Sequence, residues 1–263
     1  MVSPNSSESH LGKVIAALSS ETFESKLFQW LNRCFEIDNT TMLAYFQNKR
    51  PEILFSQSRV KSVHEKLETV YVPAAYLLDP FHALHVDQAE PGLYWLQRIA
   101  PDQFQRNEYF ATYYQRTTLV DEVAYVANPS DGVSVHICLG RDISSGRRFN
   151  AREVAKAELL APIVCALIEQ RWSGLESTGD FSDEDLARHL IEAIQEAHQI
   201  KLSPRQAQVA LLILRGHSSV SIGLRLGISP QTVKVFRKQL YSKCKISSQA
   251  ELFSLLMPLL SMH

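Results

Sequence analysis

A group of basic and polar side chains between residues 229 and 244 carries the clearest chemistry in the sequence. If this stretch is helical, one side of the helix carries Lys234, Val235, Arg237, Lys238 and Tyr241. Ammonium and guanidinium groups neutralise phosphates, and side-chain donors read the edges of base pairs. The pattern therefore favours a nucleic-acid partner.

The charge of the chain is distributed unevenly. Residues 199–263 hold nine Lys or Arg and one acidic residue, Glu251, which gives a formal charge of +8. The remainder holds 18 basic and 27 acidic residues, which gives −9 and brings the 263-residue chain to −1. A basic module on an acidic body predicts a polyanionic partner for the module alone. A basic surface that is merely solvated is the alternative.

Capping signals predict the helices that present this basic face. Ser203 can cap a helix whose first turn contains Pro204 and Gln206, a combination typical of a capping box. Gly216 offers a left-handed stop for that helix. A second, short helix from about Ser219 to Leu226 ends at Gly227, and its apolar residues are Ile222, Leu224 and Leu226. Ile228 is expected to be the buried plug of the tight turn that follows.

Ser229-Pro230 repeats the start signal and opens a third helix. Val233, Phe236, Leu240 and Cys244 recur at three- and four-residue steps, so they are expected to face the core. Two helices joined by a glycine turn, the second basic on its outer side, form a helix-turn-helix. Ser247 can start a fourth helix that ends near Pro258.

The stretch from Leu202 to Leu256 resembles the LuxR/FixJ/NarL-type DNA-binding domain. The residues that carry the resemblance are Leu202, Arg205, Val209, Leu211, Gly216, Ser218, Ile222, Leu226, Ile228, Ser229, Thr232, Val233, Lys234, Leu240, Tyr241, Lys243 and Ile246. The sequence departs from the family at Gln206 and Gln208, where acidic residues are usual.

The resemblance implies roles for individual side chains. Lys234, Val235 and Lys238 would reach base edges, and Thr232, Arg237 and Lys243 would meet phosphate. It also implies a homodimer on double-stranded DNA, with the fourth helix making the dimer contact. Activation, which would bring RNA polymerase as a partner, is the commoner habit of the family.

Patterns typical of enzymes are missing from the sequence. It contains no Gly-x-Ser-x-Gly, no phosphate loop and no paired-carboxylate motif. A phosphorylated receiver domain would need an acidic pair just after its first strand. The acidic residues near the N-terminus, Glu8, Glu21 and Glu24, are expected on helices instead, so the sequence does not favour a receiver domain. We therefore predict a protein that is not an enzyme and needs no cofactor.

One cluster has donor types that a metal could use. His82, His85 and Asp87 are spaced so that the two histidines would share a helix face. Only His64 or Cys138 suggests itself as a further ligand, so we interpret these residues as surface side chains and predict no metal site.

The pattern of residues 1–175 predicts an α+β domain with an antiparallel sheet and flanking helices. Leu119–Ala127 and Val133–Gly140 are the clearest strands, and the turn signal at 128–132 joins them into a hairpin. Asn150 and Glu153 form the capping signature of a long helix. The order of elements resembles GAF- or PAS-like sensory domains and the N-terminal domains of solitary LuxR-type regulators.

Aromatic residues are frequent in this predicted domain, and Phe104–Arg116 is expected to form one tyrosine-rich helix. The candidate effector-binding residues are Tyr94, Trp95, Tyr113, Tyr114, Tyr125, His136 and Cys138. Together they could line an amphipathic cavity for a small molecule. An aromatic core with tyrosine hydroxyls at the surface is the alternative. Asp79-Pro80 resembles a fragment of the acyl-homoserine-lactone receptors, although the surrounding Trp and Tyr spacing does not follow them.

Residues 176–198 are predicted to form a linker followed by a connector helix that starts near Ser182. Its apolar stripe comprises Ala187, Leu190, Ile191, Ile194 and Ala197. The stripe either packs on its own domain or relays a signal. We expect residues 199–263 to form an all-α, four-helix DNA-binding domain.

We expect a one-component transcription regulator with an N-terminal sensory domain that responds to a small-molecule effector. The N-terminus lacks the features of a signal peptide and no apolar run could span a membrane, so a cytoplasmic location is expected. Two alternatives remain. The protein could be an adaptor that antagonises another LuxR-type regulator, or its N-terminal domain could bind metal or catalyse a reaction while tethered to DNA.

Overall fold

The computed structural model describes residues 7–47, 49–177 and 183–261. The chain divides into two compact units, and each is built from segments that are distant in sequence. Unit 1 comprises Met1–His64, Gln88–Arg98 and Thr118–Thr178, and unit 2 comprises Glu65–Asp87, Ile99–Thr117 and Gly179–His263.

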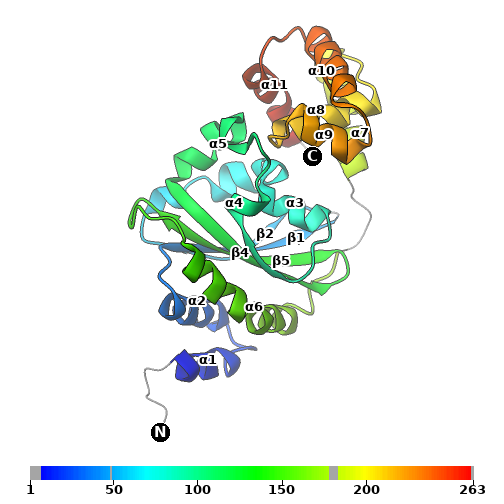
Figure 1. Ribbon diagram of the computed structural model, residues 1–263. Helices are drawn as coiled ribbons and strands as arrows, with labels where there is room; N and C mark the ends of the chain where they lie inside the picture. The colour runs from blue at the N-terminus through cyan, green and yellow to red at the C-terminus, as the bar shows by residue number, and fades with distance from the viewer. Residues whose placement is uncertain (1–6, 48, 178–182, 262–263) are drawn as a thin grey trace. The chain divides into compact units, whose positions relative to one another are not determined.

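Unit 1 is built on a five-stranded antiparallel sheet with the order β2-β1-β5-β4-β3 (Figure 1). The strands are β1 Asn39–Phe46, β2 Glu52–Ser58, β3 Gly92–Trp95, β4 Leu119–Ser130 and β5 Val133–Asp142. Its longer helices are α1 Ser7–Ile15, α2 Phe23–Cys34 and α6 Ala151–Arg171. The predicted α+β class with an antiparallel sheet is confirmed.

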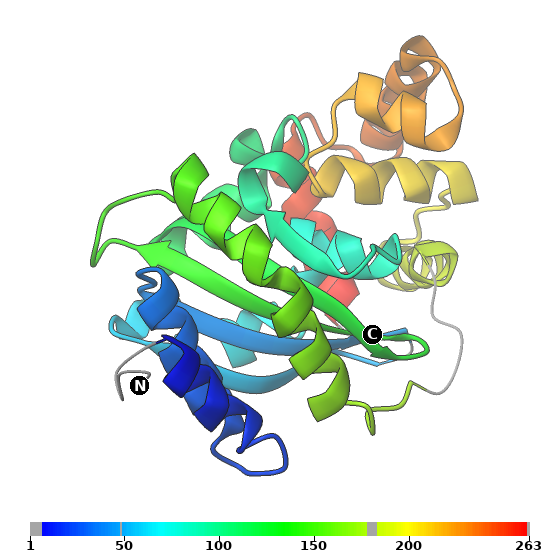
Figure 2. The ribbon, with the colours of Figure 1, turned by 60° about the horizontal axis from the view of Figure 1, so that its bottom comes forward.

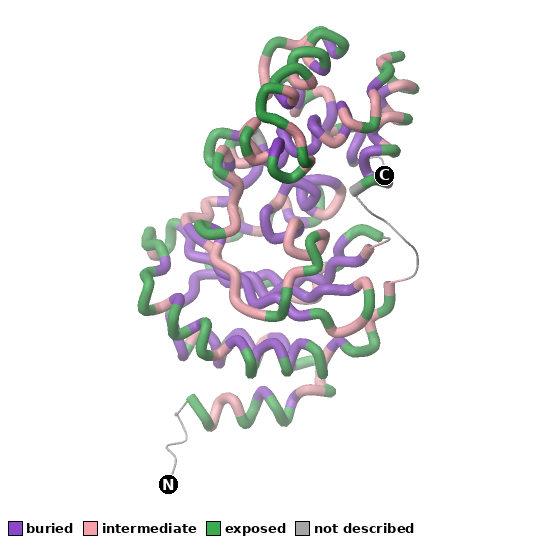
Figure 3. Tube along the Cα trace, turned by 45° about the vertical axis from the view of Figure 1, so that its right-hand side comes forward, coloured by how far each residue is buried: buried purple, intermediate pink, exposed green. Residues whose placement is uncertain are grey.

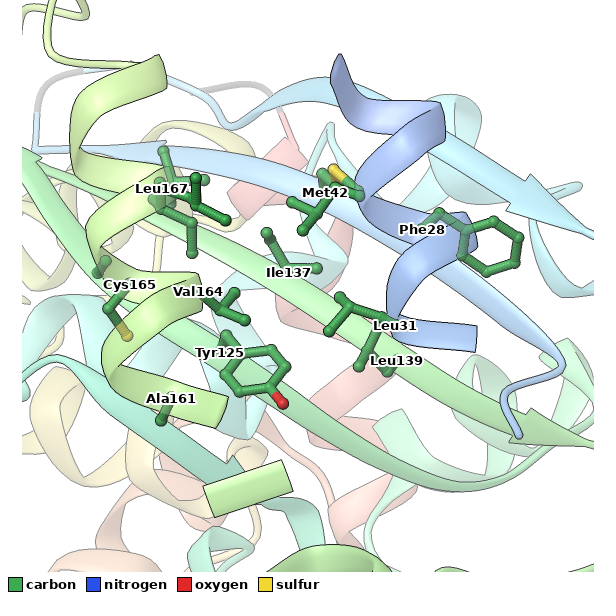
Figure 4. Packing of buried hydrophobic residues seen from close by; sticks show 14 of the residues in the cluster. Phe28, Leu31, Met42, Tyr125, Ile137, Leu139, Ala161, Val164, Cys165 and Leu167 are labelled. Carbon is green, nitrogen blue, oxygen red and sulfur yellow. The ribbon is translucent and has the colours of Figure 1, made fainter. Parts of the chain in front are cut away.

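Helices α2 and α6 cover one face of this sheet (Figure 2). Alternate residues of the strands point into the layer between them, as strand geometry requires. They include Met42, Val123, Tyr125, Val135, Ile137 and Leu139, which meet Phe28 and Leu31 of α2 and Val164 and Leu167 of α6 (Figure 4). The opposite face is also buried along β1 and β5 (Figure 3).

The predicted hairpin of β4 and β5 is confirmed, but its turn is shorter than expected. Ser130 pairs with Val133, so only Asp131 and Gly132 form the turn, with Gly132 at φ +67°. The pairing is irregular between Ala127 and Ser130. Such an irregularity tolerates Pro129, which cannot donate a ladder hydrogen bond.

The long helix after the hairpin begins as predicted. The Asn150 side chain accepts hydrogen bonds from Arg152 N and Glu153 N, and Glu153 accepts one from Asn150 N at 2.9 Å. This complete capping box fixes the start of α6, which then continues through Pro162 to Arg171.

Short helices make up the parts of unit 2 that precede the sheet hairpin in sequence. They are η2 Leu67–Tyr71, η3 Ala75–Leu78, α3 Pro80–Val86, η4 Phe104–Arg106, α5 Glu108–Thr112 and η5 Tyr114–Thr117. Two other short helices are not part of this set: η1 Lys61–Val63 belongs to unit 1, and α4 Leu96–Ile99 spans the sequence boundary between the two units. The single helix expected over 104–116 is therefore wrong. Asn107 interrupts it because its side chain accepts the Phe110 N–H at 2.8 Å and starts α5 afresh.

The C-terminal part of unit 2 is all α-helical, as predicted. Its helices are α7 Asp183–His198, α8 Pro204–Leu214, α9 Ser219–Leu226, α10 Pro230–Cys244 and α11 Gln249–Ser261. The last helix starts after Ser248, whose hydroxyl accepts the Glu251 N–H at 3.1 Å, rather than after Ser247, and it passes Pro258. The start expected at Ser182 lies outside the described residues.

Helix α7 uses its apolar stripe for packing inside unit 2. Leu190 and Ile194 are fully buried, and Ala187 is nearly so, where α7 meets α8 and α11. This supports the first interpretation of the stripe, in which it packs on its own domain.

Candidate nucleic-acid interface and effector residues

The turn between α9 and α10 depends on glycine. Gly227 ends α9 in the left-handed conformation, with φ 65° and ψ 34°. Ile228 N donates to Gly223 O at 2.9 Å, and a Cβ on Gly223 would stand 2.7 Å from Ile228 O. Only glycine therefore lets the chain turn back this closely. Ile228, expected as a buried plug, is half-buried, and Leu224, expected in the apolar set of α9, is exposed.

Helix α10 shows the two faces that its sequence predicts. Val233 and Leu240 are fully buried, whereas Lys234 and Lys238 are exposed. Val235 lies between the two lysines with 47% of its surface exposed. Within the described part of the chain neither lysine has an ion-pair partner. The outer face of α10 is thus basic and accessible, and it includes one exposed apolar side chain, Val235.

Three other predicted interface residues are held by neighbours. The Arg237 guanidinium donates to the Tyr241 hydroxyl at 3.1 and 3.3 Å and lies 5.4 Å from the centre of its ring. Thr232 belongs to the cap of α10, because its N–H donates to the Ser229 hydroxyl at 3.0 Å. Arg237 and Tyr241 therefore present one joint surface, and Thr232 marks the helix start.

Lys243 has a structural partner at the start of α8. Its ammonium donates to Lys201 O at 2.7 Å and to Gln206 Oε1 at 2.9 Å. The same Gln206 oxygen accepts the Ser203 N–H at 3.0 Å, which completes the predicted capping box. A neutral amide thus stands where a carboxylate would form an ion pair with Lys243. This lysine fastens α10 to α8 in addition to any contact with phosphate.

A segment from the middle of the chain packs against the turn between α8 and α9. Gln103 N donates to Gly216 O at 3.0 Å, and Asn107 donates to Leu214 O at 3.3 Å. Gly216 has φ +90°, and a Cβ there would lie 3.0 Å from Phe104 Cα. The left-handed stop predicted at Gly216 is confirmed, and the glycine also permits this close approach.

Charged groups lie at both ends of α9. The buried Arg215 donates to Leu77 O at 3.0 Å, Asp102 accepts the Ser218 N–H at 3.1 Å, and Arg225 pairs with Asp87 at 3.0 Å. Burial, reinforced by the Arg225 and Arg215 charges, lowers the pKa of His217 to about 4. No local sequence signal points to these contacts, because the partners are more than 100 positions apart.

Two of the candidate effector residues lie in the core between the sheet and α6. Tyr125 is fully buried there, and its hydroxyl donates to Ala157 O at 3.0 Å. Trp95 packs at the edge of the same core and donates to both Asp121 oxygens at 3.0 and 3.1 Å. Burial raises the pKa of the Asp121 carboxyl, although the Trp95 hydrogen bond opposes this. These side chains hold the fold of unit 1 together.

His136 and Cys138 point to the other face of the sheet. They alternate with Ile137, which faces α6, and both are buried. A His136 ring nitrogen lies 3.0 Å from the Ser134 hydroxyl, and the ring meets Tyr45 edge-on at 4.7 Å. The structure therefore separates these two residues from Tyr125 and Trp95, so the seven candidates do not line one cavity.

The remaining candidates occupy other places. Tyr94 lies near the surface of unit 1, and its hydroxyl donates to Glu90 O at 2.7 Å. In unit 2, Tyr113 stacks on Tyr109 and Tyr114 stacks on Phe110, both with ring centres 5.5 Å apart. Aromatic stacking, rather than a shared ligand, accounts for this part of the aromatic composition.

The Asp79-Pro80 pair starts α3 in unit 2. Asp79 accepts the Phe81 N–H at 2.8 Å and the Tyr71 hydroxyl at 2.7 Å. Burial raises the pKa of the Asp79 carboxyl, and these hydrogen bonds act in the opposite direction. Asp79 is therefore a helix cap with a buried tyrosine partner.

Among the described residues no group of three or more His, Cys, Asp and Glu could hold a metal ion, and Asp87 pairs with Arg225 instead. None of the described helices is both long and apolar enough to cross a membrane.

Comparison with known proteins agrees with this geometry. Residues 201–256 match the family described as bacterial regulatory proteins, luxR family. A protein of Aeromonas salmonicida, named as an HTH-type transcriptional regulator in the exeN 3′ region, is 30% identical over 182 residues, which cover 67% of this chain and 92% of the relative.

Solved structures are also similar. The LBD domain of VqsR from Pseudomonas aeruginosa aligns with a TM-score of 0.55 and 28% identity, over 64% of this chain and 98% of that domain. Escherichia coli SdiA aligns over 94% of this chain and 96% of its own, with 13% identity and a TM-score of 0.43.

Proposed function

The chain belongs to the luxR family of bacterial regulatory proteins, and from this we propose that it is a one-component regulator that reads duplex DNA with α10. The observation that carries the proposal is the outer face of α10, where Lys234, Val235 and Lys238 are exposed together. A helix of this kind fits the major groove, where side chains distinguish all four base-pair orientations.

The surface of α9 also supports the assignment of base reading to α10. Its one basic residue, Arg225, pairs with Asp87, and its outer side carries exposed Val220 and Leu224. It offers little free positive charge, so sequence reading falls to α10.

The test compares base and phosphate contacts. A duplex is first selected from a random pool with the full chain, and affinity for it and for random duplex is then measured. Lys238→Ala should lose about 1–3 kcal/mol on the selected duplex and little on random duplex, because a base contact carries the specificity. Equal losses of affinity for both duplexes would show that Lys238 does not contact base edges. Failure of the wild-type chain to bind any duplex would favour the adaptor function.

Lys243→Ala should weaken binding to all duplexes by a similar factor and flatten the salt dependence. Since Lys243 also holds Gln206, the variant should lose some stability of unit 2 as well. Unfolding of the variant therefore has to be measured beside its affinity.

We further propose that two copies bind an inverted repeat, since one short recognition helix makes too few base contacts for a regulator. Phe253 and Leu255 of α11 are only half-buried and suit the dimer contact on DNA. If the protein activates transcription, RNA polymerase is its further partner. One protomer per operator in sedimentation of the DNA complex would contradict the dimer.

A small-molecule effector is the last part of the proposal. Similarity to the LBD domain of VqsR supports it, as does the buried polar set of Ser134, His136 and Cys138 on one sheet face. A thermal-shift screen should use the full chain, because residues 65–87 and 99–117 cluster with C-terminal residues. A binding ligand should raise Tm by mass action, and His136→Ala should abolish that rise.

A further inference from the structure

The last turn of α9 carries a basic side chain that pairs with an acid from the middle of the chain. Arg225 is exposed there, and α9 contains no other Lys or Arg. Its guanidinium donates to both Asp87 oxygens, at 3.0 and 3.5 Å. The side chains of Arg225 and Asp87 are 42% and 48% exposed, so the ion pair lies in water and is weak. Either side chain can therefore exchange its partner for another at little cost.

A second carboxylate lies at the opposite end of α9. Asp102 accepts the N–H of Ser218, the residue that caps the helix, at 3.1 Å. Burial acts against the ionised form of Asp102, but hydrogen bonds from Ser218 outweigh it and lower the pKa of this carboxyl. Asp102 is therefore an anion at neutral pH. Each end of α9 thus has a negative charge beside it.

Contacts that do not involve the two carboxylates hold the same part of unit 2 together. Gln103, next to Asp102, donates its N–H to Gly216 O at 3.0 Å, and Asn107 donates to Leu214 O at 3.3 Å. The buried Arg215 donates to Leu77 O at 3.0 Å. The negative charges of Asp87 and Asp102 are therefore not what holds these segments against the α8–α9 turn.

The place of α9 in the helix-turn-helix gives Arg225 a second possible partner. In this motif the second helix lies in the major groove, while the first helix crosses the sugar–phosphate backbone. Here the first helix is α9, which leads through the turn at Gly227 into α10. A guanidinium binds phosphate through the same pair of N–H donors with which it binds a carboxylate. Asp87 therefore occupies the donors that a DNA phosphate would take.

We propose that Arg225 is a further contact to DNA phosphate, that Asp87 holds its donors in the free protein, and that Asp102 repels the DNA backbone at the other end of α9. The proposal rests on the proposed function, because it requires α10 to lie in the major groove. The two acids then lower the affinity for every duplex by a similar factor, since phosphate contacts carry no sequence information. If the Arg225–Asp87 pair were only structural, its removal would leave DNA binding unchanged or weaker.

The first test measures the affinity of the full chain for the selected duplex and for random duplex. Asp87→Asn and Asp102→Asn should each raise the affinity for both duplexes by ~3-fold, and the double variant should raise it by ~10-fold. Asparagine keeps the size of the side chain and an accepting oxygen but removes the charge. A gain in affinity also cannot result from misfolding, which would weaken binding.

The matched control removes two negative charges elsewhere in unit 2. Glu184 and Glu192 are exposed on α7, so Glu184→Gln/Glu192→Gln changes the net charge as much as the double variant does. Its affinity for both duplexes should stay within about twofold of the wild type, because long-range attraction between exposed charges is screened by salt.

A double-mutant cycle tests whether the gain depends on Arg225. Arg225→Ala should weaken duplex binding by the wild type by no more than ~2-fold, because Asp87 competes for the guanidinium. In the Asp87→Asn variant the same change should weaken binding by ~5-fold, because Arg225 is then free to bind phosphate. Asp87→Asn should accordingly produce no gain in a chain that already carries Arg225→Ala.

These measurements separate the proposal from the proposed function. A gain on both duplexes that depends on Arg225 supports the proposal. A wild type that binds duplex, with variants at Asp87 and Asp102 that bind no more tightly, overturns the proposal alone. A gain that persists in the Arg225→Ala chain, or that the α7 control shows equally, overturns it as well. A wild type that binds no duplex overturns the proposed function, and the role of Arg225 with it.

Discussion

Mild acid should weaken the folding of unit 2 through one histidine at the turn between α8 and α9. A His217 ring nitrogen lies 2.8 Å from the Ser221 hydroxyl, and two arginines, Arg215 and Arg225, lie near the ring. Burial and these arginines lower the pKa of His217 from 6.5 to about 4. In the unfolded chain the imidazole takes up a proton near pH 6.5, but in the folded chain it resists protonation.

The sign and size of the effect follow from linkage. Between about pH 6.5 and pH 4 the unfolded state binds more protons, so stability falls as pH falls through this window. From about pH 7.5 to pH 5 the upper limit is ~2 kcal/mol, at 1.36 kcal/mol for each pH unit between the two pKa values. Because the ring is partly exposed, solvent screening reduces this to about 1 kcal/mol.

The assay is urea unfolding of the wild type and His217→Gln at both pH values. Gln keeps a hydrogen-bonding group near Ser221 but cannot titrate, so the variant should lose about 1 kcal/mol less than the wild type on acidification. His198→Gln, at the exposed end of α7, is the control and should behave as the wild type. Equal losses of stability in His217→Gln and the wild type would show that a lowered pKa of His217 does not cause the acid sensitivity of unit 2.

Two further predictions concern the scaffold around α10. Gln206→Glu should stabilise unit 2 by about 0.5–1 kcal/mol, seen as a higher Tm, because a carboxylate would pair with Lys243 at the start of α8; a lower Tm would contradict the assigned contact. Gly216→Ala should cost at least about 2 kcal/mol in urea unfolding, since φ +90° is strained for alanine and its Cβ would meet Phe104. Gly227→Ala, with φ +65° and no atom within 4 Å of the added Cβ, should cost only about 1 kcal/mol; equal costs would argue against the Phe104 contact.

The helix-turn-helix could be predicted from the sequence because its determinants are local. Ser203 with Gln206, Gly227, and Ser229 each act on backbone groups within a few residues, and the structure contains all three caps. The core side of α10 followed from periodicity alone. The hairpin and the start of α6 were predictable for the same reason.

The candidate effector site could not be predicted, because it depends on register between strands. Alternation shows that His136 and Ile137 face opposite ways, but it does not say which of them shares a face with Tyr125. The register pairs Tyr125 with Ile137, and this places Tyr125 in the core and away from His136. Composition alone grouped side chains that the sheet separates.

The second role of Lys243 and the contacts of the α8–α9 turn were missed for a related reason. Lys243 meets Gln206 across 37 positions, and Arg225 meets Asp87 across 138. The break at Asn107 had a local signal, because Asn is a favoured cap, but the aromatic periodicity around it favoured one continuous helix.

DNA binding by α10 is tested most directly by the salt dependence of duplex binding by the full chain. Affinity for a selected duplex is measured by fluorescence anisotropy over a range of salt concentrations for the wild type and for Lys234→Ala/Lys238→Ala. Lys13→Ala, an exposed lysine of α1, is the control. If the outer face of α10 binds DNA, the double variant should lose at least ~100-fold in affinity and prefer the selected duplex less, while the control should match the wild type. A double variant with wild-type affinity, salt slope and sequence preference would contradict the claim that α10 reads DNA.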